Sequence, residues 1–320
     1  MKVGAFAVLL SDRPFEQALD QLKAAGLQAV EIGTGGYVGD AHAPAATLLA
    51  DSGRLAAFER ALTERELTIS ALSCHGNPLH PRAELAAAHH QQFRDTVLLA
   101  ERLGVERVVT FSGCPGDSDE AKRPNWVTCP WPTDFSEIVA WQWEQKVIPY
   151  WREQASFCRD HGVKVAIELH PGFVVYNAET MLRLRAEAGE QIGANYDPSH
   201  LFWQGCDPIE VVRALGPAIL HVHMKDTAID PHNNRVNGVL DTKPYAEIAG
   251  RSWVFRTVGY GHGAEFWKSL ISALRTVGYD HVLSIEHEDG LMSVHEGLTK
   301  AAAFLNEIVI SEPVGKMWWA

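Results

Sequence analysis

The chain has 320 residues, 46% of them hydrophobic, and a formal net charge of −12 from 28 basic and 40 acidic residues. This length fits one large α/β barrel or two ordinary domains, with enough apolar side chains for a full core. The acidic charge, together with the absence of a basic run, argues against nucleic acid as a ligand.

Short apolar runs alternate with amphipathic stretches along the chain, as strands and helices do in an α/β protein. The expected strands are Val3–Leu10, Gln28–Gly33, Thr68–His75, Glu106–Ser112, Val163–Glu168, Ile192–Asp197, Ala218–His223 and Val282–Glu288. The expected helices are Phe15–Ala25, Ala45–Glu66 interrupted near Gly53, Ala83–Leu103, Glu137–Asp160 broken near Pro149, Ala178–Ala188, Pro208–Leu215, Glu265–Val277 and Val294–Ile308.

This alternation predicts a single (β/α)8 TIM barrel over residues 1–310, followed by a C-terminal tail, residues 311–320. The strands are rich in Val, Ile, Leu and Ala, as expected when both faces of a parallel sheet are buried. Two irregular stretches, Gly113–Asp134 after strand four and Ala228–Gly263 after strand seven, are expected to be long loops. A doubly wound open sheet is the alternative, but it does not readily explain ligand-type residues ending strands across the whole chain.

The N-terminal run Val3–Leu10 is too short to span a membrane, and no clear cleavage site follows it. The five cysteines are widely spaced and include no CxxC pair, so neither a disulfide framework nor a zinc ribbon is indicated. These features predict a cytoplasmic protein with reduced thiols and no membrane partner.

Four of the expected strands end in side chains that bind hard or borderline cations. These side chains are Glu168, Asp197, His223 and Glu286. The carboxyl ends of barrel strands converge on one mouth, where three carboxylates without a cation would repel each other. We therefore expect one divalent metal ion, with Mn²⁺ favoured and Mg²⁺, Co²⁺ and Zn²⁺ as alternatives. The two glutamates also offer an acid and a base across a bound sugar.

Other polar side chains close to these strand ends are candidates for substrate contacts. They are His200, His75, Asn77, Lys225, Arg256 and His262. His170 is a candidate base, because it lies two residues after Glu168 on the same strand face. Each has a structural alternative: a capping or core histidine, an ion pair at a strand end, or a glycine-rich turn. Asp226 is a candidate to orient a ligand histidine, and Glu31, at the end of strand two, is a weaker candidate site residue.

The segments VAIELHPG, NYDPSH, HVHMKD and SIEHED occur in an order and spacing that resemble the xylose-isomerase-like TIM-barrel superfamily, the sugar phosphate isomerase/epimerase family. The resemblance covers nearly the whole chain. It implies that Glu168, Asp197, His223 and Glu286 hold the metal, that the two glutamates move protons on the sugar carbon, and that His200 contacts the substrate. The segments CHGNPLHP and FSGCPGD and the Trp-rich insertion are similar to a branch acting on 3-keto-glycosides. No phosphate cradle is evident.

The leading hypothesis is a metal-dependent sugar isomerase or epimerase that removes a proton next to a carbonyl and passes through an enediolate. Elimination from the same site would make a lyase or deglycosidase subunit acting on 3-keto-glycosides. An AP-endonuclease-like nuclease and a non-catalytic sugar-binding subunit are weaker alternatives. The Trp-rich insertion and the tryptophans of the tail indicate a homo-oligomer or a second protein subunit, unless they cover the barrel's own apolar surface.

Overall fold

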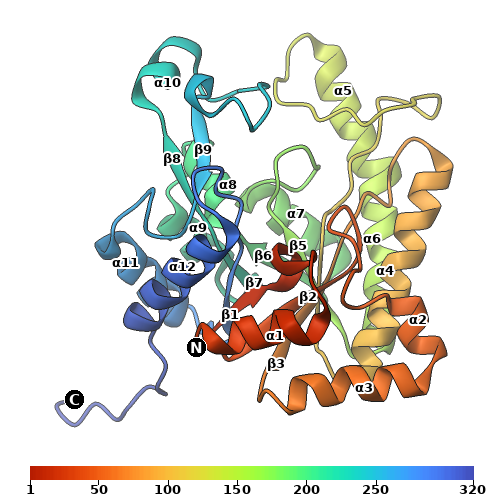
Figure 1. Ribbon diagram of the computed structural model, residues 1–320. Helices are drawn as coiled ribbons and strands as arrows, with labels where there is room; N and C mark the ends of the chain where they lie inside the picture. The colour runs from red at the N-terminus through yellow and green to blue at the C-terminus, as the bar shows by residue number, and fades with distance from the viewer.

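The computed structural model describes residues 1–320 and contains a closed barrel of parallel strands surrounded by helices (Figure 1). Around the barrel the strands follow the order β1-β10-β7-β6-β5-β4-β3-β2. They are β1 (Lys2–Phe6), β2 (Ala29–Gly36), β3 (Thr68–His75), β4 (Arg107–Thr110), β5 (Lys164–Glu168), β6 (Ile192–Tyr196), β7 (Ile219–Met224) and β10 (Val282–Ile285). The expected TIM barrel is therefore confirmed.

Helices follow the strands, and most of them pack an apolar face against the outside of the barrel. They are α1 (Phe15–Ala24), α2 (Ala45–Ala50), α3 (Ser52–Thr63), α4 (Ala83–Leu103), α5 (Thr133–Trp141), α6 (Ile148–Asp160), α7 (Ala178–Ala188), α8 (Pro198–Trp203), α9 (Pro208–Leu215), α10 (Pro231–Asn237), α11 (Ala264–Thr276) and α12 (Val294–Ile308). Of these, α5 and α10 contain no buried residue. Local sequence sets several boundaries: Asn177 caps α7 in a capping box, and Gly104 ends α4 in the left-handed region. No helix is both long and apolar enough to cross a membrane.

Three predicted strands end two or more residues earlier than expected, and one of them, Glu106–Ser112, is reduced to Arg107–Thr110. The run Val3–Leu10 is a strand only as far as Phe6, and Ala7–Leu10 is a 3₁₀ helix, because apolar content alone does not distinguish the two. The last barrel strand ends at Ile285, three residues before the expected end at Glu288. Its neighbour β7 ends at Met224, the partner of Ile285, and only the Glu286 N–H extends the pairing, through a bond to the Met224 carbonyl.

The expected break near Pro149 is wrong. A π-helical turn, Gln142–Val147, joins α5 to α6, and Pro149 lies in the first turn of α6. Proline is tolerated there because the first turn of a helix leaves backbone N–H groups without helical partners. The interruption expected near Gly53 lies at Asp51, whose carboxylate accepts the N–H groups of Gly53 and Arg54 and caps α3.

The stretch Ala228–Gly263 is more ordered than the expected loop. Two antiparallel strands, β8 (Asp226–Ile229) and β9 (Trp253–Arg256), form a small sheet, and α10 lies between them in the chain. Figure 1 shows β8, β9 and α10 rising above the barrel on one side and α5 with its preceding loop on the other. These two insertions flank the end of the barrel where the strands terminate.

The barrel interior changes from apolar to polar along the strands. On β3, Ala71, Ser73 and His75 share one face, and on β5 Ala166 and Glu168 do the same, because side chains alternate along a strand. A small apolar cluster fills the interior below the polar residues; it consists of Ala71, Val109, Ala166 and Leu220. Most titratable side chains of the interior thus lie near the strand ends, whereas His221 lies deeper, beside Ser70.

The end of β2 approaches β3 too closely for a side chain at Gly36. Gly36 has φ +75° and pairs with His75, and a Cβ atom there would lie 1.9 Å from the His75 carbonyl oxygen. We expect Gly36→Ala to cost about 3 kcal/mol or more in free energy of unfolding, measured by chemical denaturation. Gly39→Ala is the control, because Gly39 has φ +73° but no atom within 4 Å of its Cβ position; it should cost only about 1 kcal/mol. Equal losses would show that the close approach is unimportant.

Candidate active site

The four residues predicted to hold a metal come together at one end of the barrel. Glu168 ends β5, Asp197 follows β6, His223 lies on β7 and Glu286 follows β10. Their potential ligand atoms all lie within 4.8 Å of one another. Glu168, Asp197 and His223 are buried, and the Glu286 side chain is only 12% exposed. Three carboxylates and one imidazole in this arrangement form a donor set that fits a divalent cation.

Lys225 supplies a positive charge beside these carboxylates. Its ammonium nitrogen lies 2.7 Å from Glu286 Oε2, 3.1 Å from Asp197 Oδ2 and 3.0 Å from Glu288 Oε2. Burial alone would lower the pKa of Lys225, but the charges of Asp197, Glu286 and Glu288 raise it well above its ordinary value. Lys225 is therefore a fixed cation that faces the predicted metal ligands from the position directly after β7, two residues beyond His223.

Neighbouring histidines and Lys225 also influence the charge states of the glutamates. Burial would raise the pKa of Glu168, but its interactions with His200 and His75 lower it well below the ordinary value. For Glu286 the effect of burial is outweighed by the charges of Lys225 and His223, so its pKa is also lowered. Both glutamates are thus carboxylates near neutral pH, the form in which they bind a metal or accept a proton.

His223 faces two sets of carboxylates with its two ring nitrogens. Nδ1 lies 3.0 Å from Glu286 Oε2 and 3.6 Å from Glu168 Oε2, toward the predicted metal ligands. Nε2 lies 3.0 Å from each carboxylate oxygen of Glu31 on the opposite side. Burial would lower the pKa of His223, but Glu31 and Glu286 raise it well above its ordinary value. A metal ion at the predicted site would take the place of a proton on Nδ1, the nitrogen that faces Glu286 and Glu168.

Three further histidines surround Glu168. His75 Nε2 lies 2.8 Å from Glu168 Oε2, so this predicted substrate contact is directed at a carboxylate of the site. His200 Nε2 lies 3.3 Å from Asp197 Oδ2 and 3.5 Å from Glu168 Oε1 but makes no hydrogen bond. The His170 ring lies 4.1 Å from the His200 ring. Burial and the charge of His200 lower the pKa of His170 to about 3, so His170 is neutral at pH 7.

The remaining predicted substrate contacts have structural partners. The Asn77 side chain hydrogen bonds with the backbone of Leu79 and Cys114 and joins the loops after β3 and β4. Arg256 donates to Asp289 at 3.0 Å. His262 lies 2.8 Å from Asp226 and its ring stacks on Phe202. None of these three belongs to the potential metal-binding groups or lines the pocket described below, so their contact with substrate remains a prediction.

The hypothesis that Asp226 orients a ligand histidine is wrong. Asp226 accepts hydrogen bonds from the backbone of Gly259, Gly261 and His262 and from the His262 ring. It therefore fixes the loop before α11. Because it begins β8 in the small sheet above the barrel, it does not contact His223.

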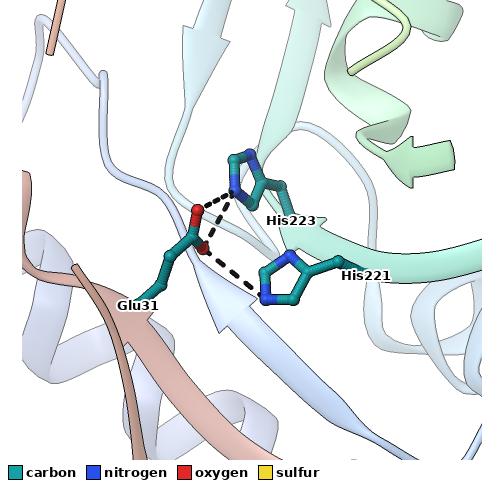
Figure 2. A group of neighbouring side chains, drawn as sticks. All are labelled: Glu31, His221 and His223. Carbon is teal, nitrogen blue, oxygen red and sulfur yellow. Dashed lines mark hydrogen bonds and ion pairs between the residues drawn. The ribbon is translucent and has the colours of Figure 1, made fainter. Parts of the chain in front are cut away.

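Glu31, the weaker candidate in the sequence, is the residue that contacts His223. Figure 2 shows the Glu31 carboxylate between His223 and His221. Burial would raise the pKa of Glu31, but the charges of His223 and His221 and hydrogen bonds from His223 and Ser73 lower it to about 2. The position of Glu31 at the end of an apolar strand was the available sequence signal, but nothing local indicated that His223 was its partner.

A pocket of about 350 Å³ opens beside the metal-ligand cluster. It is lined by His170, Tyr245, Ile248, Val254, Phe255, Glu288, Gly290 and Leu291. Lys225 lies over the Phe255 ring, 4.7 Å from its centroid, so the apolar wall adjoins the charged cluster. Small-molecule sites commonly combine such a concave, largely apolar wall with a few convergent polar groups.

The chain belongs to the Xylose isomerase-like TIM barrel family, whose model matches residues 19–308. Among curated proteins, the uncharacterized protein YfiH of Bacillus subtilis (strain 168) is 38% identical over 312 residues. That match covers 97% of this chain and 99% of YfiH. The family membership thus agrees with the barrel and with the resemblance seen in the strand-end segments.

Solved structures share the fold at low sequence identity. The probable 3-DHS dehydratase AsbF from Bacillus anthracis has a TM-score of 0.67 at 18% identity, covering 96% of this chain and 99% of AsbF. The IOLI protein with a binding zinc atom has a TM-score of 0.66 at 19% identity, covering 97% and 98%. D-psicose 3-epimerase in the presence of D-fructose has a TM-score of 0.59 at 15% identity, covering 97% and 99%.

The buried His221 makes stability depend on pH. Burial lowers its pKa from 6.5 to about 3, although the nearby Glu31 opposes this effect. Above pH 6.5 both folded and unfolded chains hold His221 neutral; below it only the unfolded chain binds the proton, so stability falls as pH decreases toward 3. We expect His221→Gln to reduce the loss of unfolding free energy between pH 6.5 and 4 by roughly 3 kcal/mol.

Denaturation at several pH values measures this slope. His232→Gln, on the exposed surface of α10, is the control and should keep the wild-type slope. A wild-type slope in His221→Gln would contradict the burial of a neutral His221.

Proposed function

We propose that this protein is a divalent-metal-dependent sugar isomerase or epimerase that removes a proton next to a sugar carbonyl and passes through an enediolate. The observation that carries the proposal is the convergence of Glu168, Asp197, His223 and Glu286, with ligand atoms within 4.8 Å of one another. Proteins that share this fold include one named D-psicose 3-epimerase in the presence of D-fructose and one named IOLI protein with a binding zinc atom. These names agree with the proposed reaction and with a divalent ion.

In the proposed site, the four residues hold the metal ion, which when bound polarises the substrate carbonyl as a Lewis acid. Glu168 and Glu286 each place a carboxylate oxygen near His223 Nδ1, at 3.6 and 3.0 Å. One glutamate accepts the proton from the carbon next to the carbonyl as the enediolate forms. The enediolate is then reprotonated either by that same glutamate or by the other one, which in that case takes its proton from water while the first releases its proton to water. Return to the other face of the same carbon gives epimerisation, and return to the neighbouring carbon gives isomerisation.

The surrounding side chains position the substrate and balance its charge. The Lys225 ammonium is held close to Glu286 and faces the same space, so it is placed to stabilise a developing enediolate oxygen. His170 is neutral and borders the pocket, which makes it an alternative base. Phe255 and Tyr245 offer aromatic faces against which the C–H face of a sugar ring can pack. The substrate is proposed to be a free sugar or keto-sugar.

Elimination is the second candidate reaction. The same proton removal, followed by loss of a group from the adjacent carbon, gives a dehydratase, a lyase or a subunit that cleaves 3-keto-glycosides. The favouring observation is the pocket beside Glu288 and His170, which provides space for a leaving group next to the proposed site of proton removal. A probable dehydratase has the same fold. The choice between outcomes depends on where the substrate carries its leaving group.

A nuclease and a non-catalytic subunit have less support. The net charge of −12 opposes binding to a polyanion, and the complete set of ligand-type residues in the mouth is not needed for sugar binding alone. Mn²⁺ remains the favoured ion in the proposal, with Mg²⁺, Co²⁺ and Zn²⁺ as alternatives. A cytoplasmic location and a homo-oligomer, or a complex with a second protein subunit, are also proposals.

The test of the function is metal analysis of the purified protein combined with a proton-exchange screen. Free ketoses, inososes and 3-keto-glycosides are incubated in D₂O with protein and Mn²⁺, and deuterium incorporation is followed by NMR. We expect incorporation next to the carbonyl, with loss of exchange on chelation of the metal. Absence of both metal binding and exchange with every substrate class would contradict the proposal.

Glu286→Gln tests the acid and base assignment. The change preserves size but removes the charge that accepts a proton and binds the metal, so we expect the fold to be retained and turnover to fall by at least about 100-fold. Glu296→Gln makes the same change on the surface of α12 and should leave turnover unchanged. Circular dichroism checks the fold, and a wild-type rate in Glu286→Gln would show that the assignment is wrong.

A further inference from the structure

Glu31 is a carboxylate buried in the barrel on the side of His223 that faces away from the predicted metal ligands. Its side chain, like those of His221 and His223, has no exposed surface. Both of its oxygens lie 3.0 Å from His223 Nε2. Figure 2 shows the carboxylate directed at the edge of the His223 ring, with His221 beside it. Glu31 thus contacts Nε2, the ring nitrogen of His223 that does not face the proposed metal site.

Two serines hold the carboxylate in this orientation. Ser73, on β3, donates to Oε1, and Ser284, on β10, donates to Oε2 at 2.7 Å. β3 is the direct neighbour of β2 on one side, and β10 lies on the other side beyond β1. The oxygens are therefore fixed by neighbours that do not move with His223, and the carboxylate is pre-positioned as an acceptor for Nε2–H.

Retaining a carboxylate at this depth is costly unless it has a specific partner. Removing a carboxylate from water costs several kcal/mol even after relaxation, and two serine hydroxyls do not neutralise its charge. No lysine or arginine makes an ion pair with Glu31; its ion-pair partners are His223 and, at 3.7 Å, His221. His221 Nδ1 is already engaged at 3.0 Å by Asn195 Oδ1. His223 is therefore the main hydrogen-bond and ion-pair partner of Glu31.

We propose that Glu31 is a positioning residue of the metal centre: it accepts the Nε2–H of His223, fixes the tautomer and the ring plane, and thereby presents Nδ1 to the metal. This inference rests on the metal site of the proposed function. Carboxylates that hold the second nitrogen of a ligand histidine raise its basicity and lower its freedom to rotate. Glu31 therefore contributes to metal affinity without contacting metal or substrate.

A second metal ion bound by Glu31, His221 and His223 is the competing explanation, because these residues also form a group with ligand atoms within 4.8 Å. The observed contacts favour the hydrogen-bonded arrangement. Each carboxylate oxygen already receives a serine hydroxyl, and both oxygens lie at hydrogen-bond distance from the same ring nitrogen. A second ion would have to displace these bonds, so we expect one metal ion per chain.

The experiment measures Mn²⁺ affinity and stoichiometry of the whole protein by chelator competition, with the Co²⁺ absorption spectrum as a second readout. We expect Glu31→Gln to weaken Mn²⁺ binding by about 10- to 100-fold, and Glu31→Ala to weaken it further, because the amide oxygen of Gln can still accept a weaker bond. The Co²⁺ spectrum should shift in both variants, since the orientation of His223 changes. Far-ultraviolet circular dichroism of the metal-free variants checks folding.

Ser70→Ala is the matched control, because Ser70 is buried on β3 below Ser73 and contacts His221 but neither Glu31 nor His223. It should retain wild-type affinity. If the Glu31 variants do not fold, the double variant Ser73→Ala/Ser284→Ala removes the donors that orient Glu31 and should weaken binding by about 10-fold.

The outcomes separate this inference from the proposed function. Wild-type protein that binds no divalent metal overturns both. Metal binding of wild-type strength and an unshifted Co²⁺ spectrum in Glu31→Gln, or in the double-serine variant when that is the one tested, overturn only the role of Glu31. Two ions in wild type and one in Glu31→Gln would establish the competing second site.

Discussion

The arrangement of this protein depends on burying several carboxylates at one end of a barrel. Glu31, Glu168, Asp197 and Glu286 lie within a few side chains of each other. Burial alone would raise the pKa of Glu31, Glu168 and Glu286 and favour their neutral forms. The structure instead surrounds them with imidazoles and the Lys225 ammonium, which keeps them charged. Because these cations neutralise the carboxylates only in part, the cluster can stabilise one more cation.

The barrel makes this cluster possible because apolar side chains and ionisable side chains occupy different parts of its interior. Its lower interior is filled by small apolar residues, whereas the upper interior holds ionisable side chains from neighbouring strands. Since every barrel strand is hydrogen bonded on both sides, the side chains stand on rigid backbone. Glu31 and the two serines show how this rigidity extends beyond the predicted ligands to the groups that orient them.

The insertion after β7 adds an apolar pocket wall beside the charged cluster. Phe255 packs against the Lys225 ammonium and, with Tyr245, forms part of the pocket wall. The insertion that carries them contains its own small sheet, which is joined to α8 by a hydrogen bond from Thr227 to the Ser199 carbonyl and by stacking of Trp253 on Trp203. Variation of this insertion would alter which molecules reach the centre without disturbing the ligand set below it.

The sequence by itself determined the barrel and the meeting of Glu168, Asp197, His223 and Glu286, because periodic burial sets strand and helix, and parallel strands must end at one mouth. The sequence misplaced strand ends that depend on the length of the neighbouring strand, as at Ile285. It also predicted a loop where β8 and β9 form, because these two strands pair across many intervening residues. Only the tertiary structure joined Glu31 to His223 and Asp226 to His262. Glu31 and His223 are 192 residues apart in the chain, and no local pattern specifies which buried carboxylate faces which ring nitrogen.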